Sequence, residues 1–310
     1  MSSNMDLELL KHYRVQEIIG KGGNGEVFAG VRKKDGKEVA IKRIRKRKSE
    51  RKKNKKILPC EVFMLNHLQG VPGVISILDY MQSSTSHYII MERILARDLF
   101  DFISNHPKGV TEEVAKDIFR QVVNTVRHCK KKGVLHGDIK DENIIINEKT
   151  KEVKLIDFGS SSLWTEEEFS RYFGTREYAP PEWFSSRKMT AEGLTVWSLG
   201  MLLASLLCGD LPRQLGKGRL EFPGSLSSTA LDLLNKCLDR NPQSRIQLTD
   251  VSRHPWLRPV LHDSRRQEEL NIHCRSQVLV PTKLTNEIDV IYEDRNCSTD
   301  TYLFTPPIYV

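Results

Sequence analysis

Three side chains between Val134 and Gly159 have the types and the order that phosphate chemistry requires. Asp138 and Asn143 precede two short apolar runs, and Asp157 follows them. A polar turn separates the runs, which predicts a small β-hairpin that holds the three side chains close together. In phosphoryl transfer one carboxylate orients the attacking hydroxyl group, and other oxygen ligands hold Mg²⁺ against the phosphates. The stretch therefore predicts a phosphoryl-transfer site.

The spacing of these three residues is more specific than the short motif around Asp138 or the one around Asp157 alone. A lone His-x-Asp or a lone Asp-Phe-Gly occurs by chance in many proteins. Here Asn143 follows Asp138 by five residues, and Asp157 follows Asn143 by fourteen. The combination is specific, and the other parts of such a site should then lie upstream in a fixed order.

A glycine-rich loop, Gly20-x-Gly22-x-x-Gly25, lies between two strand-like runs. A dinucleotide-binding loop would instead lead from a strand into a helix. Glycines let backbone N–H groups approach a phosphate closely, so a glycine-rich hairpin over phosphates fits this position. A plain glycine turn remains the alternative for this motif alone.

Two charged residues follow the glycines in the expected order. Lys42 is the single charge of the apolar strand 39–42, and Glu61 lies on a helix that follows Pro59. The apolar residues of that helix, Val62, Leu65 and Leu68, recur every three residues and predict its buried face. Glu61 is the candidate carboxylate partner of Lys42.

Residues 13–257, read as a whole, resemble a protein kinase domain in the order of these motifs. The resemblance implies an α+β bilobal fold. A small antiparallel β-sheet and one main helix would form the N-lobe, about 13–92, and the hinge would span 92–97. A larger and mostly α-helical C-lobe would span 98–257.

The same resemblance implies ATP and Mg²⁺ as cofactors and assigns a role to each motif. The implied catalytic residues are Asp138, Lys140, Asn143 and Thr175, with Asn143 and Asp157 as Mg²⁺ ligands. Asp138 would orient the substrate hydroxyl with support from Thr175, and Lys140 would steady the γ-phosphate. The implied nucleotide-binding residues are Ile19, Gly20, Lys21, Gly22, Gly23, Asn24, Gly25, Val27, Ala40, Lys42, Glu61, Met91, Glu92, Ile145 and Asp157. Met91 would be the gatekeeper.

Several segments resemble the Pim family of serine/threonine kinases more closely; they are 98–103, 126–129, 133–136, 138–143, 180–183 and 196–200. Kinases of that family prefer basic residues before the target Ser or Thr. The matching acidic positions here are Asp98, Asp101, Asp141 and Glu142. They could also be ordinary exposed acids, and Asp98 could contact a ribose hydroxyl instead.

Four departures from the family pattern bear on function. Gly137 stands where most kinases have an arginine that anchors a phosphorylated activation loop, here 160–182. Thr195 replaces a common aspartate, as in the Pim pattern. The hinge is one residue shorter than the Pim hinge and lacks proline, and an acidic run is missing after 209–212. We therefore expect a different inhibitor preference, a weaker reading of basic substrates and activity without activation-loop phosphorylation.

Two other functions compete with an active kinase. Gly137 favours a pseudokinase that acts as a binding scaffold, but all five residues whose loss usually marks a pseudokinase are present: Lys42, Glu61, Asp138, Asn143 and Asp157. A nucleic-acid binder would rest on one basic run. Residues 43–56 hold ten Lys or Arg and one Glu, a net +9 against +8 for the whole chain. A nuclear-import signal or a solvated loop explains that run as well.

The remaining sequence predicts an intracellular protein. The six cysteines have no C-x-x-C spacing, and the first residues have no apolar signal region. The apolar stretch 194–208 suits a buried helix and is too short to span a bilayer. We expect a monomer in the cytoplasm or nucleus, with no membrane contact and no nucleic acid required. Residues 1–12 should be flexible, and 258–310 should be a disordered tail.

Two further features concern the C-lobe. Thr111 can cap a helix that ends at Gly133, and its Val114, Ile118, Val122 and Val126 repeat every four residues. The activation loop closes at Glu182, whose expected ion-pair partner is Arg245. Either of these two charges could instead be a solvated surface group.

Overall fold

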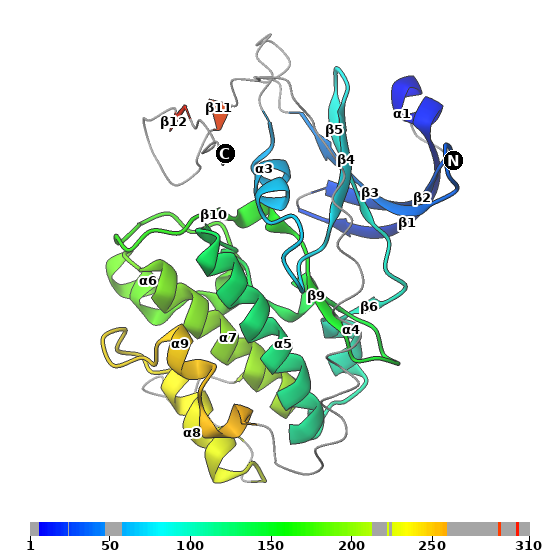
Figure 1. Cartoon of the computed structure of the whole chain (residues 1–310). Coiled ribbons are helices and arrows are strands. Elements are labelled where there is room, and N and C mark those ends of the chain that lie inside the picture. The colour runs from blue at the N-terminus through cyan, green and yellow to red at the C-terminus, as the bar shows by residue number, and fades with distance from the viewer. Residues whose placement is uncertain are drawn as a thin grey trace, which may run out of the picture.

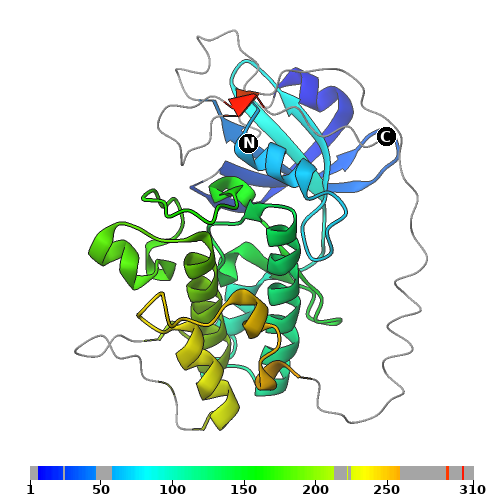
Figure 2. The ribbon, with the colours of Figure 1, turned by 60° about the vertical axis from the view of Figure 1, so that its left-hand side comes forward.

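The computed structural model describes residues 6–23, 25–46, 58–212, 222 and 225–258, together with the backbone of 291–292 and 302–303. Two lobes are stacked, a β-sheet lobe above a helical lobe (Figures 1 and 2). This is the α+β bilobal arrangement that the sequence predicts. The basic residues 47–56, Asn24 and nearly all of the expected tail lie outside the described residues, apart from the paired strands β11 (Ile291–Tyr292) and β12 (Tyr302–Leu303).

The N-lobe is built on one antiparallel sheet of five strands in the order β1-β2-β3-β5-β4. The strands are β1 (Tyr13–Gly22), β2 (Gly25–Arg32), β3 (Glu38–Arg45), β4 (Ile77–Gln82) and β5 (Ser86–Glu92). Successive strand residues point to opposite faces. One face packs on α3 (Cys60–His67), and the other packs on α1 (Leu7–His12).

Helix α1 corrects the expectation of a flexible lead-in at 1–12, because its residues 7–12 are packed on the sheet. Leu9 is 1% exposed, in a cluster with Phe28 and Tyr88. The Tyr88 hydroxyl also donates to Asp6, at 2.6 Å. A helix of six residues is too short to hold itself in water, so these tertiary contacts must stabilise it.

The C-lobe is formed by helices, namely α4 (Leu99–Ser104), α5 (Glu112–Lys131), α6 (Pro181–Ser186), α7 (Ala191–Cys208), α8 (Ser228–Cys237) and α9 (Leu248–Val251). Thr111 caps α5 as predicted, since its hydroxyl oxygen accepts the N–H of Val114 at 3.4 Å. The predicted face of α5 is buried at Ile118, Val122 and Val126, with Val114 half-buried.

Helix α7 passes through the centre of the C-lobe. Among the described residues it is the one helix long and apolar enough to cross a membrane, and 83% of it is buried inside the protein. It is longer than the stretch 194–208 that the sequence marks, because three residues from Ala191 precede that stretch. The buried core helix of a soluble domain has the same composition.

Short strands place the predicted chemistry between the lobes. The predicted hairpin is present as β8 (Ile144–Ile146) paired antiparallel with β9 (Val153–Leu155), and β6 (Arg97–Asp98) extends it. A second small sheet pairs β7 (Val134–Leu135) with β10 (Ser162–Leu163). The ends of these strands carry the catalytic-loop residues 136–143 and the start of the activation loop.

The buried side of α1 gives a stability prediction with a control on the same helix. Leu9→Ala should lower the free energy of unfolding by about 2–3 kcal/mol, because it removes a fully buried side chain. Leu7→Ala should have little effect, since Leu7 is 80% exposed. Denaturant unfolding measures both, and equal effects would show that α1 is not packed as described.

Candidate active site

Lys42 on β3 is held between two carboxylates that come from distant parts of the chain. Its Nζ lies 2.7 Å from Oε1 of Glu61 on α3 and 2.8 Å from Oδ1 of Asp157, which follows β9. The side chains of Lys42 and Glu61 are only 6% and 2% exposed. Burial by itself lowers the pKa of Lys42, but the charges of Glu61 and Asp157 outweigh it and hold that pKa above its ordinary value. The predicted Lys42–Glu61 partnership is thus present.

Asp138 is fixed by a bond to each of its carboxylate oxygens. Oδ1 accepts the backbone N–H of Thr175 at 2.7 Å, and Oδ2 accepts Nδ2 of Asn143 at 2.9 Å. Asn143 Nδ2 also lies 2.8 Å from the carbonyl oxygen of Asp138. Thr175 therefore supports Asp138 as predicted, but through its backbone N–H, a contact that its side-chain type could not reveal.

His136 is buried beneath Asp138 and orients the loop that carries it. Its Nδ1 accepts the N–H of Asp138 at 3.2 Å, so Nε2 carries the proton and donates to the carbonyl oxygen of Ile156 at 3.0 Å. The ring also meets Phe158 edge-on, with centroids 4.6 Å apart. Burial lowers the pKa of His136, which favours this neutral form.

Asp157 and Asn143 together fit a Mg²⁺ site. Asp157 has φ of +58°, a left-handed conformation that is uncommon for a residue other than glycine. Asn143 uses its NH₂ group on Asp138, which leaves its side-chain oxygen as an acceptor. A carboxylate and an amide oxygen are hard ligands, and Mg²⁺ typically takes one or two protein ligands together with phosphate and water oxygens.

The glycine loop joins β1 to β2, as predicted. Gly25 has φ of +134°, and a Cβ there would lie 2.3 Å from the carbonyl oxygen of Arg43, so packing within the N-lobe requires glycine at this position. A Cβ at Gly22 or Gly23 would meet no atom within 4 Å. The packing of the chain itself does not require these two glycines, which is consistent with space kept for phosphates.

Four apolar nucleotide-site candidates, Ala40, Met91, Val27 and Ile145, pack in one core cluster, whereas Ile19 is 48% exposed. Ala40 pairs with Met91 across β3 and β5, and both are buried. Val27 and Ile145 are half-buried, and Gly20, Ile19 and Lys21 lie on β1. Of these, Gly20 pairs with Val27.

The carboxylate of Glu92 is occupied within the protein. It accepts the N–H of Ser76 at 2.8 Å and lies 2.7 Å from Nζ of Lys154. Burial raises the pKa of Glu92, but these two partners outweigh burial and hold the pKa below its usual value. Both bonds use the same carboxylate oxygen, Oε1, and tie the Glu92 side chain to Ser76 and Lys154.

The four acidic substrate candidates occupy different environments. Asp101 and Glu142 are exposed, and Glu142 forms an ion pair with Lys140. Asp98 is half-buried and caps α4 by accepting the N–H of Asp101 at 2.7 Å. Burial raises the pKa of Asp98.

Asp141 is a correction to the predicted substrate set. It is 4% exposed, and its carboxylate accepts the hydroxyl groups of Tyr178 at 3.1 Å and Ser205 at 2.8 Å. Both oxygens are engaged, so Asp141 ties the catalytic loop to α7 and does not face a peptide. The prediction missed Tyr178 and Ser205, and the one available signal was a serine inside an apolar helix, which needs a partner.

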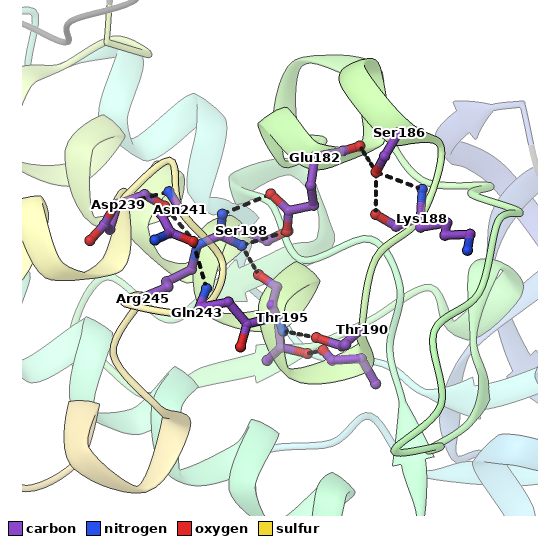
Figure 3. Close-up of polar contacts among 12 residues, drawn as sticks. Glu182, Ser186, Lys188, Thr190, Thr195, Ser198, Asp239, Asn241, Gln243 and Arg245 are labelled. Carbon is purple, nitrogen blue, oxygen red and sulfur yellow. Dashed lines mark hydrogen bonds and ion pairs between the residues drawn. The ribbon is translucent and has the colours of Figure 1, made fainter.

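The predicted Glu182–Arg245 ion pair is present in the C-lobe (Figure 3). Both guanidinium Nη atoms meet the carboxylate, at 2.7 and 2.8 Å, and Arg245 also donates to the carbonyl oxygens of Gly193 and Asp239. The side chain of Arg245 is 1% exposed. The pair fixes the end of the activation loop against the start of α7.

Comparison with known proteins decides the family. The family described as "Protein kinase domain" matches residues 13–257. The chain belongs to the protein kinase family. Among its relatives, serine/threonine-protein kinase pim-2 of Danio rerio is 36% identical over 264 residues, which cover 80% of this chain and 85% of the relative. Serine/threonine-protein kinase prk-2 of Caenorhabditis elegans is 38% identical over 259 residues, covering 80% and 58%.

These relatives confirm the resemblance to Pim kinases. The chain is also similar to a serine/threonine kinase of another family. NUAK family SNF1-like kinase 1 of Homo sapiens is 33% identical over 260 residues, covering 80% of this chain and 39% of the relative. The kinase described here is an ATP-dependent protein serine/threonine kinase with the bilobal kinase fold.

The buried ion pair of this kinase gives a second stability prediction. Arg245→Met should lower the free energy of unfolding by about 3–5 kcal/mol, because it leaves the Glu182 charge buried without its partner. Lys236→Met removes a cation of similar length from an exposed ion pair with Asp232 and should have a small effect. Denaturant unfolding of the two variants makes the comparison, and a small loss for Arg245→Met would refute the assigned role of the pair.

Proposed function

We propose that this kinase transfers the γ-phosphate of ATP to serine or threonine residues that follow basic residues. We propose further that it does so without a phosphate on its activation loop. The observation that carries the proposal is the arrangement around Asp138, whose carboxylate is already held by Thr175 and Asn143. A second candidate, the pseudokinase scaffold, rests on Gly137 alone.

Each residue of the site has a part in the proposed transfer. Asp138 lies where it can orient the substrate hydroxyl and accept its proton. Lys42 would hold the nucleotide phosphates, with Glu61 keeping its ammonium group in place. Lys140 would leave Glu142 to steady the γ-phosphate. Mg²⁺, when bound by Asn143 and Asp157, supplies positive charge that neutralises the phosphates.

Exposed acids support the preference for basic substrates. Asp101 and Glu142 lie at the surface, and the half-buried Asp98 lies close to both of their charges. Arginine side chains of a peptide can form charge-assisted hydrogen bonds with such carboxylates. Asp141 is not part of this proposal, because both of its oxygens are engaged inside the protein.

Phosphate-independent activity is supported by the contacts that hold the activation loop. Backbone pairing joins β10 to β7, and Phe169 exchanges two hydrogen bonds with Met189, at 2.9 and 3.1 Å. Trp164 and Tyr172 pack on an apolar cluster that includes Leu135, Met189 and Leu194. None of these contacts requires a phosphate.

The acids of the activation loop contribute little to holding it in place. Glu168 lies 4.0 Å from Lys188 at an exposed position, where an ion pair adds little. Glu166 accepts the indole N–H of Trp164 at 3.0 Å. A cation does contribute elsewhere, because Nζ of Lys130 lies 4.5 Å from the Trp164 ring and 2.5 Å from Glu192.

Peptide phosphorylation tests the reaction and the substrate class together. With Mg²⁺ and ATP, the wild-type kinase should phosphorylate a serine peptide with preceding arginines, and replacing those arginines by glutamines should raise KM about tenfold. Asp138→Asn should lower kcat about a thousandfold while ATP binding changes little, because the carboxylate acts on the peptide hydroxyl. Isothermal calorimetry measures ATP binding. If the wild-type chain phosphorylates no basic Ser or Thr peptide, the scaffold is favoured.

Phosphatase treatment tests the independence from activation-loop phosphate. Mass spectrometry should first confirm that Ser160 to Thr175 carry no phosphate. The kcat/KM of this sample should then stay within about tenfold of untreated kinase, since backbone and apolar contacts hold the loop. A fall of more than about a hundredfold, or about 2.7 kcal/mol of transition-state stabilisation, would refute this part of the proposal.

A further inference from the structure

The backbone at Gly137 is enclosed by the activation loop. Gly137 has φ of +81°, and a Cβ at this position would lie 2.4 Å from the carbonyl oxygen of Ser160. On another side, a Cβ at Gly174 would lie 2.4 Å from the carbonyl oxygen of Gly137. The start and the end of the activation loop therefore both press against the catalytic loop at Gly137, at a distance that a larger residue would not allow.

Because the two loops are so close, Ser161 forms two hydrogen bonds, one through its hydroxyl group and one through its carbonyl oxygen. Its hydroxyl donates to the carbonyl oxygen of His136 at 3.0 Å, and the residue is 6% exposed. Its own carbonyl oxygen accepts the thiol of Cys60 at 3.1 Å. Cys60 is the first residue of α3 and directly precedes Glu61.

These bonds continue to the catalytic aspartate. His136, whose carbonyl receives the Ser161 hydroxyl, accepts the N–H of Asp138 through its ring. A chain of hydrogen bonds thus runs from the start of α3, through Cys60, Ser161 and His136, to Asp138. It links the helix that carries the Lys42 partner with the loop that carries the group acting on the substrate.

Helix α3 has particular need of such a tether. It has eight residues, and Pro59 at its start offers no side-chain cap. A helix of this length depends on tertiary contacts for its position. The Cys60 bond fixes the end of α3 from which Glu61 projects.

We propose that Cys60 and Ser161 are positioning residues that couple the placement of Glu61 to the placement of Asp138. Gly137 permits this coupling, because it makes room for Ser160 and so brings Ser161 to His136. In this view Gly137 is not a lost phosphate anchor but part of a direct contact that takes the place of one. The inference rests on the proposed transfer activity, so the wild-type rate is measured first.

Ser161→Ala tests the first link. It should lower kcat about tenfold while KM for ATP and the melting temperature change little, because the cavity is the size of one hydroxyl group. Ser161→Thr keeps the hydroxyl and should restore most of kcat. Ser162→Ala is the matched control, since Ser162 is also buried and its hydroxyl makes one long hydrogen bond within the described residues, to the neighbouring carbonyl of Leu163 at 3.4 Å.

Substitutions at Cys60 test the second link, from Cys60 to Ser161, and its coupling to the first link, from Ser161 to His136. Cys60→Ala should lower kcat by a similar factor. Cys60→Ser should recover only part of it, because a hydroxyl group is a stronger donor than a thiol but its shorter C–O bond leaves it farther from the Ser161 carbonyl oxygen. Cys208→Ala, at a half-buried cysteine at the end of α7, is the control. The Cys60→Ala and Ser161→Ala effects should not add in the double variant, since they interrupt one chain.

Gly137→Arg distinguishes this inference from the reading of Gly137 as a defect. A lost anchor would be restored by arginine, and kcat would rise. Our proposal expects kcat to fall, by tenfold or more, because the new Cβ displaces Ser160. A rise in kcat for Gly137→Arg, an unchanged kcat for Ser161→Ala, or additive losses in the Cys60→Ala/Ser161→Ala double variant would each overturn the proposal.

Hydrogen exchange keeps the test independent of activity. Ser161→Ala and Cys60→Ala should speed amide exchange in α3, and Ser162→Ala should not. If the wild-type chain transfers no phosphate, the proposed function fails, and this measurement alone then decides the coupling. Equal exchange in α3 for Ser161→Ala and Ser162→Ala would refute it.

Discussion

The buried charge of Lys42 is the constraint on which the rest of the site depends. An ammonium group removed from water is costly unless carboxylates and hydrogen bonds compensate it. Here the compensating groups come from α3 and from the residue after β9, so the N-lobe sheet, its helix and the C-lobe hairpin must all be in place at once. Loss of either carboxylate leaves Lys42 underpaired in the interior. The electrostatic cost of that state keeps the two lobes in the arrangement that phosphate transfer requires.

The same principle organises the C-lobe around buried polar groups. Arg245 satisfies Glu182 with both Nη atoms, and Asp141 accepts hydroxyl groups from Tyr178 and Ser205. Both groups are joined to α7, because Arg245 also donates to the carbonyl oxygen of Gly193 at the start of α7 and Ser205 belongs to that helix. The loops can then hold catalytic groups without regular secondary structure, because their polar atoms have fixed partners on a rigid helix.

Sequence alone predicted those features that depend on local pattern. The β8–β9 hairpin, the Thr111 cap and the phosphate-site residues follow from periodicity, turn chemistry and motif order. The burial of Asp141 could not be predicted, because its partner Ser205 lies 64 residues away and only the folded C-lobe brings them together. Helix α1 was missed since six residues show too little periodicity, and its stability comes from the sheet. The support of Asp138 by the backbone N–H of Thr175 could not be predicted either, because a backbone donor does not depend on the type of side chain.

Gly137 shows how the meaning of one residue changes between sequence and structure. In the sequence, Gly137 stands where a phosphorylated activation loop would need an arginine. In the structure the missing side chain of Gly137 is a condition for contact, because the carbonyl oxygen of Ser160 lies where a Cβ of Gly137 would be. Backbone and apolar contacts hold the activation loop whenever the chain is folded, whereas contacts to a phosphate hold it only after phosphorylation. In the mechanism we propose, glycine in place of arginine removes a point of control as well as a cation, and contacts that form when the chain folds place Glu61 and Asp138.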